Sequence, residues 1–390
     1  MNAPKLRFKE FNDDWKKINL KSVFNYYSTN SLSREQLSNS GIIKNIHYGD
    51  IHRKFSTIVD INRHVDSFIK DLNYKNKNEL CKNYDLIFAD ASEDYEGIGK
   101  AIELINVDFN TVSGLHTILA RDVQNSFAPK FKGYYFNSPI IHNQIRVLAN
   151  GFKVYGISKE TINKLNVNIP SKNEQTKIAN TLELLDKKIE LQSKKIEDLK
   201  LFKKGLILSL KKNSFDWHTV CIKDLFKITR GVVIPKNELS EFKNGEYKYP
   251  VYSSQTSNEG ILGYSDTFDF NGKYLTWTTD GANAGKVFYR NGKFRCTNVC
   301  GVLYEDNIIF TNELFAELLN YETPKHVSYV GNPKLMNNVM ADIKIKIPSG
   351  DVQENTSLII NTINNKVNLE KKKLLKFKEL KKGLMQNMFV

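Results

Sequence analysis

Residues 169–206 read IPSKNEQTKIANTLELLDKKIELQSKKIEDLKLFKKGL, and residues 347–384 read IPSGDVQENTSLIINTINNKVNLEKKKLLKFKELKKGL. The two stretches align without a gap at an offset of 178 residues, and 13 of the 38 aligned pairs are identical. A repeat of this length predicts that the chain holds two copies of one structural unit.

A second, shorter repeat precedes each of these stretches. RFKEFNDDWKKINLKSVF, residues 7–24, resembles SFDWHTVCIKDLF, residues 214–226, and Trp15 then matches Trp217 at an offset of 202 residues. The two offsets differ by 24 residues, so the region between the repeats is shorter in the second copy. The chain is therefore a tandem duplication whose ends match and whose middles differ, which suggests one scaffold carrying two different readers.

Apolar residues recur at steps of three, four and seven along both long stretches, which predicts one apolar stripe on each of two long helices. These helix-pairing positions are Leu182, Leu185, Ile189, Ile196 and Leu199 in the first copy and Ile360, Ile363, Val367, Leu374 and Phe377 in the second. Gln192 and Glu370 occupy equivalent positions in the stripe and are candidates for a polar layer that fixes the register.

The expected helix ends follow from capping residues. Ser171 and Glu174 have the spacing of a capping box, and Ser349 keeps the cap position in the second copy. Gly205 and Gly383 stand where such helices often end. A helix of this length is a rod of about 50 Å.

The orientation of the two helices follows from connectivity. The second middle joins the end of the first helix to the start of the second helix. Parallel helices would separate these two points by about 50 Å, whereas a domain of this size has a radius of gyration of about 14 Å. We therefore predict an antiparallel coiled coil with one globular domain at each end, related by pseudo-twofold symmetry, in an α+β fold.

Both middles are rich in aromatic and β-branched residues separated by turn signals, which predicts α+β globular domains. The expected strands are 86–89, 101–107, 117–120 and 134–136 in the first middle, and 274–278, 286–289 and 299–304 in the second. Asn-Gly pairs at 271–272 and 291–292 predict hairpin turns.

Composition limits the class of protein. The chain has 390 residues, a net charge of +14 and a pI near 9.3, which favours two or more domains and an anionic partner such as nucleic acid. A Lys-rich surface kept for solubility is the alternative. No run of 18 apolar residues, no signal peptide and only four cysteines occur, so we expect a reduced cytoplasmic protein that does not span a membrane.

No motif in the sequence indicates catalysis. The stretch Gly281–Lys286 has three residues between its glycines rather than the four of a P-loop, and a tight turn between strands explains it better. Cys296 and Cys300 lack the further ligands of a zinc site, and the seven histidines follow no ligand spacing. The chain contains no Pro-Pro, so the signature of an amino-methyltransferase is absent.

Two different domains on a rigid rod suit a long linear ligand. B-DNA repeats about every 34 Å, so two readers on one rod could contact two half-sites roughly a turn apart. Lys and Arg would then position the protein on phosphates, while a few polar side chains would read base edges.

The order and duplication of these features resemble the specificity subunits of type I restriction-modification systems over essentially the whole chain. The resemblance rests on the paired Ile-Pro-Ser helices, the Trp-bearing segments and the two dissimilar middles, with YDLIFADASEDYEGIGKA (84–101) and YLTWTTDGANAGKVFYRNGKF (274–294) among the similar stretches. It implies two target-recognition domains, each reading one half of a split, asymmetric site on double-stranded DNA. The helices would set the unread gap and dock two methyltransferase subunits.

The resemblance also implies the partners that carry the chemistry. Motor-nuclease subunits would complete the complex, and S-adenosylmethionine, ATP and Mg would belong to these partner subunits, with no cofactor in this chain. The chain would be non-catalytic by itself and required for the adenine methyltransferase and ATP-dependent endonuclease activities of the complex.

Polar residues in turn-like segments are the candidates for DNA contact, because their side chains suit hydrogen bonds to base edges. In the first domain they are His47, Tyr48, Asp50, His52, Arg53, Ser92 and Glu93; in the second they are Ser253, Ser254, Gln255, Thr256, Thr278 and Thr279. For each of them an ordinary loop residue is the alternative.

The expected domains are 1–168 and 211–346 for target recognition, with spacer helices at 169–210 and 347–390. Two other classes of protein remain open. One is a scaffold whose coiled coil joins two protein-binding domains, against which the basic charge and the divergent middles argue. The other is a complete nuclease or methyltransferase.

Overall fold

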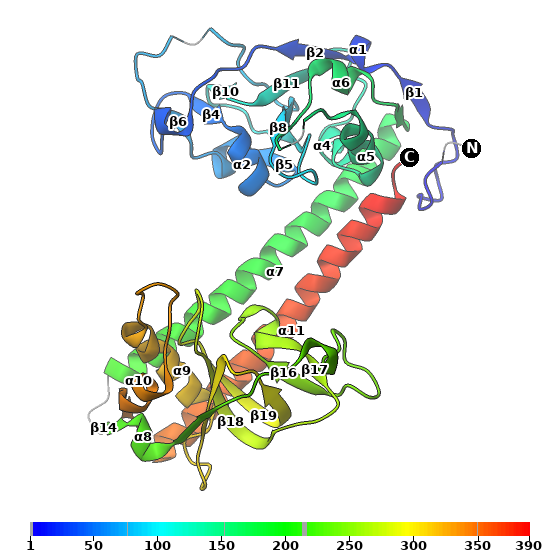
Figure 1. Cartoon of the computed structure of the whole chain (residues 1–390). Coiled ribbons are helices and arrows are strands. Elements are labelled where there is room, and N and C mark those ends of the chain that lie inside the picture. Colours follow the sequence, from blue (N-terminus) through cyan, green and yellow to red (C-terminus); the bar gives the residue numbers. More distant parts are fainter. Residues whose placement is uncertain (1–2, 76, 152, 213–216, 349) are drawn as a thin grey trace. The chain divides into compact units, whose positions relative to one another are not determined.

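The computed structural model describes residues 3–75, 77–151, 153–212, 217–348 and 350–390. The chain forms two compact units: unit 1 comprises Met1–Gln192 with Lys373–Val390, and unit 2 comprises Ser193–Lys372. Two long helices, α7 (Lys172–Lys212) and α11 (Gly350–Asn387), each contribute one part to unit 1 and one part to unit 2 (Figure 1). Each unit therefore contains a globular head and a segment of the helix pair.

A short two-stranded sheet begins and closes the head of unit 1. Strand β1 (Lys16–Ile18) pairs antiparallel with β13 (Val167–Ile169), which directly precedes α7. Helix α1 (Leu20–Val23) follows the first of these strands, and α6 (Lys159–Asn163) precedes the second. The Trp-bearing segment and the Ile-Pro-Ser segment thus meet at the base of the head.

Unit 2 repeats this arrangement with the same register. Strand β14 (His218–Cys221) pairs antiparallel with β21 (Lys344–Ile347). His218 lies opposite Ile347, as Lys16 lies opposite Ile169 in unit 1, and these positions differ by the two repeat offsets of 202 and 178. Together with α8 (Ile222–Leu225) and α10 (Asn337–Asp342), the shared register confirms the predicted tandem duplication.

The head of unit 1 is built on a five-stranded sheet. Its strand order is β2 (Phe24–Tyr27), β11 (Thr117–Asp122), β7 (Leu86–Ala89), β9 (Ala101–Ile105), β5 (Ile58–Asp60). Side chains alternate across the central strand β7: Leu86 and Phe88 pack with α4 (Phe131–Phe136) and α5 (Pro139–Leu148), whereas Ile87 packs on the other face with α2 (Tyr48–Arg53).

Smaller elements complete this head. A four-stranded sheet has the order β10 (Thr111–Ser113), β4 (Lys44–Ile46), β6 (Phe68–Ile69), β3 (Leu37–Ser38), and β12 (Tyr155–Gly156) pairs with β8 (Ala91–Ser92). The 3-10 helix η1 (Arg34–Gln36) and helix α3 (Ile61–His64) lie in the connections.

The head of unit 2 contains one six-stranded sheet. Its strand order is β15 (Lys227–Arg230), β20 (Cys300–Tyr304), β18 (Phe270–Thr278), β19 (Val287–Cys296), β16 (Tyr249–Tyr252), β17 (Ile261–Ser265). One face, with Trp277, packs on α9 (Glu313–Glu322), and the other face, with Phe294, packs on Tyr252. The short 3-10 helices η2 (Lys236–Glu238), η3 (Ser257–Gly260) and η4 (Thr323–His326) connect these elements.

The helix segments in each unit run antiparallel, as predicted. In unit 1, the start of α7 shares a core with Met388 and Phe389 at the end of α11, and Lys381 pairs with Asp186. In unit 2, Lys195 bonds to Glu370 at 2.9 Å and Lys203 to Asn364 at 2.8 Å, so residue numbers rise along one helix as they fall along the other.

All ten predicted helix-pairing residues are buried or half-buried. Leu182, Leu185, Ile196, Ile360, Ile363 and Val367 are buried, and Ile189, Leu199, Leu374 and Phe377 are half-buried. Glu370, one of the two predicted polar-layer residues, is also buried and bonds to Lys195 of the opposite helix.

The predicted helix ends need correction. Both helices continue past Gly205 and Gly383, because packing against the opposite segment outweighs the cost of one glycine. Ser171 accepts a hydrogen bond from the Glu174 backbone at 3.4 Å, but the Glu174 carboxylate binds Arg7 instead of closing the capping box. Ser349 lies outside the described residues.

The strand predicted at 134–136 is wrong, since Phe131–Phe136 is helix α4. The buried carboxylate of Glu103 accepts hydrogen bonds from the backbone N–H groups of Lys130 and Gly133 at 2.7 and 2.8 Å. A side chain from a neighbouring strand thus supplies the missing cap of the first turn. This tertiary contact overrides the strand propensity of the aromatic residues.

The prediction of hairpin turns at the two Asn-Gly pairs is also wrong. Asn271 and Gly272 lie opposite Lys293 and Gly292 within the β18–β19 ladder, with positive φ at both glycines. The connection between the strands is the stretch Gly281–Lys286, so the prediction of a turn rather than a P-loop at this stretch is confirmed.

None of the described helices combines the length and the apolar character needed to cross a membrane.

Candidate nucleic-acid interface

In unit 1, the predicted contact segment His47–Arg53 forms the cap and body of helix α2. The His47 imidazole accepts a hydrogen bond from the Gly49 backbone at 3.1 Å, which satisfies one of the free N–H groups at the helix start. Asp50 is 2% exposed and forms a two-pronged ion pair with Arg34, with both N–O distances 2.9 Å. His47 and Asp50 therefore hold the segment together from inside.

Burial and the Arg34 guanidinium lower the pKa of the His47 imidazole. The neutral ring matches the role of its Nδ1 atom as a hydrogen-bond acceptor, because a protonated Nδ1 could not accept from Gly49. Arg34 lies in η1 and is half exposed, so it can present charge to a ligand while it fixes α2. Arg34 was not among the contact residues predicted from the sequence.

A second group of side chains lies around the half-exposed Tyr48. Its ring makes edge contacts with His52 and His116, at centroid distances of 6.2 and 5.2 Å. His116 is half exposed, has a φ of 54°, and bonds to Asp90 at 3.2 Å. Burial raises the pKa of the Asp90 carboxyl, and the His116 imidazole opposes that shift. Tyr48 is thus the centre of an exposed cluster of hydrogen-bonding rings.

His116 and Asp90 were also not among the predicted contact residues, although Asp90 lies in the stretch 84–101 quoted above. No sequence pattern connects these residues with Tyr48. Asp90 follows β7 and His116 follows β10, and the two residues lie at the same edge of the head. The Asp90 backbone N–H donates a hydrogen bond to the His116 carbonyl at 3.1 Å and so joins the two turns.

The other predicted residues of unit 1 divide into exposed and structural positions. Arg53 and Glu93 are exposed. Ser92 is buried, and its hydroxyl donates to the Asp94 carbonyl at 2.7 Å and accepts from the Asp94 backbone N–H at 3.1 Å. His52 bonds to the Ala91 carbonyl at 2.9 Å and so connects α2 to the Ser92 turn.

In unit 2, the predicted segment Ser253–Thr256 is a half-buried loop that follows β16. Arg290 fixes the 3-10 helix η3, which follows this loop. Its guanidinium lies between the rings of Tyr252 and Phe288, 3.5 and 4.4 Å from their centroids, and donates to the Glu259 carbonyl at 2.7 Å. Arg290 is 7% exposed, and burial lowers its pKa. Arg290 was not among the contact residues predicted from the sequence.

The two remaining predicted residues are both buried: Thr278 ends β18, and Thr279 begins the connection to β19. The Thr278 hydroxyl donates to the Asn283 carbonyl and accepts from the Lys286 backbone N–H at 3.1 Å, and the Thr279 hydroxyl donates to Asp280 at 2.6 Å. Both hydroxyls are therefore occupied within the turn. Among the predicted residues of this head, the Ser253–Thr256 loop is the more available surface.

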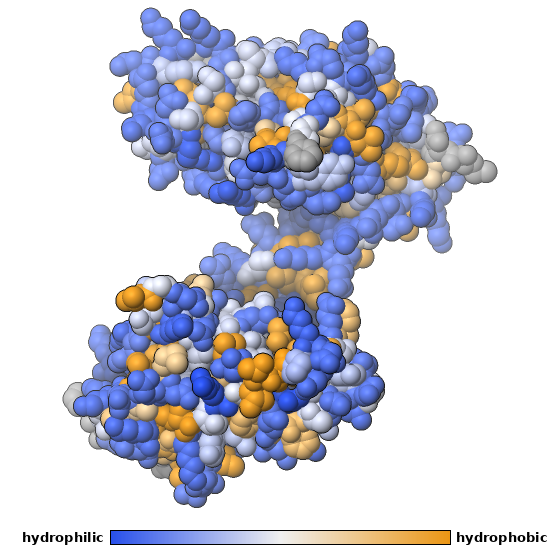
Figure 2. Space-filling view, viewed as in Figure 1, coloured by the Kyte–Doolittle hydropathy of each residue, from blue (hydrophilic) through white to orange (hydrophobic). Residues whose placement is uncertain are grey.

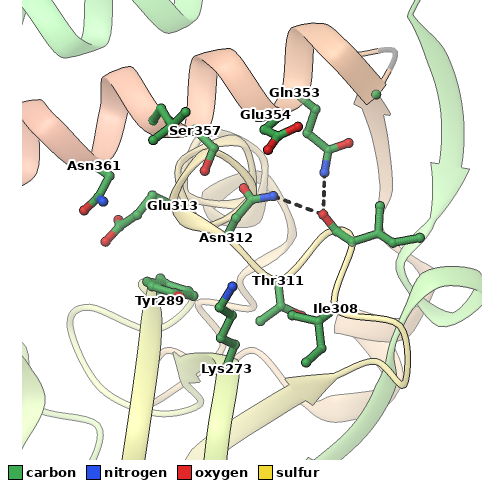
Figure 3. A pocket seen from close by; sticks show the side chains of 13 residues that line it. Lys273, Tyr289, Ile308, Thr311, Asn312, Glu313, Gln353, Glu354, Ser357 and Asn361 are labelled. Atoms are coloured by element: carbon green, nitrogen blue, oxygen red, sulfur yellow. Dashed lines mark hydrogen bonds between the residues drawn. The ribbon is translucent and has the colours of Figure 1, made fainter.

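Unit 2 also contains a hollow of about 440 Å³ between β18, β19, the start of α9 and α11 (Figure 3). Amide groups of Asn312 and Gln353 both donate to the Ile309 carbonyl at its edge, at 3.3 and 2.8 Å. Tyr289 lines the hollow, and its neighbour Arg290 points to the opposite face of the sheet. The hollow is thus on the helix side of the sheet, away from the Ser253–Thr256 loop.

Figure 2 shows that hydrophilic residues cover most of the visible face of each unit. Within the described part of the chain, no three His, Cys, Asp or Glu side chains are grouped so that they could hold a metal ion.

The family model of the type I restriction modification DNA specificity domain matches the chain twice, over residues 12–201 and 215–379. The chain belongs to this family. The two matched regions correspond to the two copies of the duplication, so each copy is one specificity domain. The resemblance proposed from the repeats is confirmed.

Relatives from Mycoplasma pneumoniae support the family membership. A protein described as the N-terminus of a putative type I specificity subunit is 44% identical over 145 residues, covering 37% of this chain and 76% of the relative. A second putative type I specificity subunit is 34% identical over 220 residues, covering 54% of this chain and 80% of the relative. The type I restriction enzyme MpnII specificity subunit is 41% identical over 145 residues, covering 37% of this chain and 43% of the relative.

Solved structures support the specificity-subunit fold. The S subunit of a type I restriction-modification system from M. genitalium superposes with a TM-score of 0.66 at 17% identity, covering 100% of this chain and 99% of that one. A chain from a study of complex assembly and conformational transition in the type I R-M system gives a TM-score of 0.54 at 13% identity, covering 98% and 99%.

Proposed function

We propose that this specificity subunit selects the DNA sequence on which a type I restriction-modification complex acts. Each head reads one half of a bipartite, asymmetric site on double-stranded DNA. We assign reading to residues 1–168 and 211–346, and we assign the setting of the gap and the docking of two methyltransferase subunits to the helices at 169–210 and 347–390.

The duplication with dissimilar heads carries this proposal. Two specificity domains share the β1–β13 and β14–β21 pairing register, yet one head holds a five-stranded sheet and the other a six-stranded sheet. Identical heads would favour a palindromic site, whereas different heads on one frame favour two different half-sequences. The net charge of +14 supports a polyanionic ligand.

The chemistry belongs, in this proposal, to the partner subunits. Two methyltransferase subunits would bind S-adenosylmethionine and methylate adenine, and motor-nuclease subunits would use ATP and Mg to cleave. The chain itself would be non-catalytic and would act in the cytoplasm, where the host DNA lies. Methyl transfer by the isolated chain with S-adenosylmethionine would contradict this division of labour.

Methylome sequencing of a host that carries this chain with its partner subunits tests the proposal. We expect one methylated motif with two unequal specified halves separated by an unspecified gap. A continuous motif, a palindrome, or methylation without sequence preference would contradict it.

A helix insertion tests the role of the helices as a spacer. Seven residues inserted after Leu191, with seven inserted at the facing position of α11, keep the apolar stripe in register. The insertion adds about 10 Å of helix and should lengthen the gap by about 3 base pairs. An unchanged gap in an active complex would contradict the spacer role.

A further inference from the structure

Two cysteines lie in contact beneath the candidate interface of unit 2. The Sγ atoms of Cys296 and Cys300 are 3.6 Å apart, and both residues are buried. Cys296 ends β19 and Cys300 begins β20, so only the tight turn Thr297–Val299 separates them. By contrast, Cys81 and Cys221 lie in different units.

The turn between these cysteines is bonded directly to the predicted contact loop. The Thr297 backbone N–H donates to the Tyr252 carbonyl at 2.9 Å, and the Thr297 hydroxyl bonds to the Ser253 hydroxyl at 3.0 Å. Any change in the geometry of the cysteine turn therefore reaches Tyr252 and Ser253, each through one hydrogen bond.

The local electrostatics distinguish the two thiols. The hydrogen bond with Cys296 and the nearby Arg290 guanidinium lower the pKa of Cys300, while burial opposes them. Burial raises the pKa of Cys296. A redox-sensitive cysteine typically combines a lowered pKa, a resolving thiol beside it and access to solvent. Cys300 has the first two properties; because it is buried, peroxide must reach it through the turn, at the exposed Asn298.

We propose that Cys296 and Cys300 form a reversible dithiol–disulfide switch that responds to peroxide and moves the Ser253–Thr256 loop. The consequence for DNA reading rests on the proposed function of this head. The Cys300 thiolate attacks one oxygen of hydrogen peroxide, the O–O bond breaks, and the leaving hydroxide takes up a proton to become water. Cys296 then attacks the resulting sulfenic sulfur, an S–S bond forms, the S–O bond breaks, and a second water leaves.

We expect disulfide formation to displace the turn. An S–S bond is about 2.05 Å long, so the sulfurs must approach each other by about 1.5 Å. Gly231 limits the movement on one side, since even a Cβ at this position would lie 2.0 Å from the Cys296 carbonyl oxygen. The turn can instead move on the side where Asn298 is exposed and Thr297 holds Ser253.

Peptide mass spectrometry of the peroxide-treated full chain tests the chemical step. Both cysteines fall in one tryptic peptide, residues 296–325, because Arg295 precedes it and Lys325 is the next basic residue. We expect this peptide to lose two hydrogen atoms, to resist alkylation, and to recover both properties after treatment with dithiothreitol. Cys81 should remain a thiol. Free thiols at 296 and 300 after peroxide treatment would overturn the proposal.

Selection from a pool of random duplexes tests the coupling. The complex of the full chain with its methyltransferase subunits is used reduced and peroxide-treated, with Cys300→Ser as the variant that cannot form the bond and Cys81→Ser as the control. Oxidation should weaken preference for the second half-site about fivefold, equivalent to the loss of one hydrogen bond, and leave the first half-site unchanged.

The Cys300→Ser complex should not respond to peroxide, and the Cys81→Ser complex should respond like the wild type. A disulfide that leaves the second half-site unchanged would overturn the coupling. A reduced complex without any sequence preference would contradict the proposed function itself, and the disulfide would still be measurable by mass.

Discussion

Unit 1 and unit 2 begin and end their heads in the same way, with β1 paired to β13 and β14 paired to β21 at equivalent register. Between these pairs, unit 1 holds a five-stranded sheet with a separate four-stranded sheet, whereas unit 2 holds a single six-stranded sheet. The parts that join the long helices are thus duplicated closely, and the parts distant from them have diverged. The strand pairs next to the helices are therefore constrained in sequence and register, whereas the sheets between them are free to diverge.

The heads also differ in how they fix their candidate contact segments. In unit 1, Arg34 forms a two-pronged ion pair with buried Asp50 and stays half exposed. In unit 2, Arg290 is itself buried between two aromatic rings and bonds to a backbone carbonyl. Arg34 therefore keeps an exposed surface, whereas Arg290 is enclosed and also bonds to Thr276 of β18 at 3.1 Å.

The largest effect on the free energy of unfolding is expected in the apolar helix stripe, on which both units depend. Leu185 in unit 1 and Ile363 in unit 2 are both buried in the helix stripe. Leu185→Asp or Ile363→Asp should each cost about 4 kcal/mol, because an unpaired carboxylate replaces a packed side chain. Chemical denaturation measures this cost.

The matched controls are Leu184→Asp and Leu369→Asp, whose side chains are 61% and 53% exposed on the same helices. They should change the free energy of unfolding by less than about 0.5 kcal/mol. Equal destabilisation by the control and the stripe variants would contradict the helix pairing.

Replacing each of the two arginines alone should weaken the sequence preference of its own head and leave that of the other head unchanged. Arg290→Met should remove the stacking and the bond to Glu259, at a cost of about 2 kcal/mol, and should weaken preference for the second half-site only. Arg34→Met should leave the Asp50 carboxylate buried without its main partner, at a similar cost, and should weaken the first half-site only.

Half-site preferences of the two arginine variants can be compared by selection from random duplexes. Arg290→Lys is an informative companion, because it keeps the charge but loses the planar stack, and should recover only part of the preference. If either single variant weakened both half-sites equally, the independence of the heads would be refuted.

A smaller effect concerns one hydrogen bond of the contact loop in unit 2. Ser253→Ala removes the partner of the Thr297 hydroxyl and should cost about 1 kcal/mol. The matched change in unit 1, Ser92→Ala, removes the hydroxyl that bonds to Asp94 at a similar cost. Thermal unfolding of the two variants measures the loss of stability in each case. An unfolding temperature that stays unchanged in either variant would contradict the hydrogen bond described for that segment.

The smallest effect is the dependence of stability on pH that His47 in unit 1 contributes. Because the pKa of His47 is lowered in the folded protein, the unfolded chain binds more protons as the pH falls below about 6.5. Stability should therefore fall as the pH drops below this value and be constant above it. The Asp50 carboxylate favours protonation, whereas Arg34 and His116 oppose it.

His47→Asn provides the control for this effect, since asparagine keeps the helix cap but does not titrate. The difference in unfolding free energy between wild type and variant should shrink or change sign from pH 7 to pH 5. A difference that is constant over this range would show that His47 does not titrate during unfolding.

The sequence predicted those features that repeat or alternate. The two offsets identified the duplication, the apolar stripe predicted the paired helices, and connectivity predicted their antiparallel orientation. Phe131–Phe136 escaped prediction because Glu103, distant in sequence, caps the helix. The Asn-Gly pairs were misassigned because two glycines face each other across a ladder, which local propensity does not reveal.

The candidate site was less accessible to sequence reasoning. The segments around Tyr48 and Ser253 were identified from polar, turn-like composition, and they lie in a helix cap and in a half-buried loop. Arg34, His116 and Arg290 were missed, because each reaches its segment through a contact between residues far apart in the chain. Composition identifies segments, whereas the fold decides which side chains support them and which remain free.

The central claim, that two independent heads read two half-sites from one frame, is tested most directly by a chimera. Residues 25–168 are replaced with the corresponding head of another specificity subunit, and the methylome of a host with the chimeric complex is sequenced. We expect the first half of the motif to change to that of the donor, with the second half and the gap unchanged. A motif that changes in both halves, or in neither, would contradict the claim.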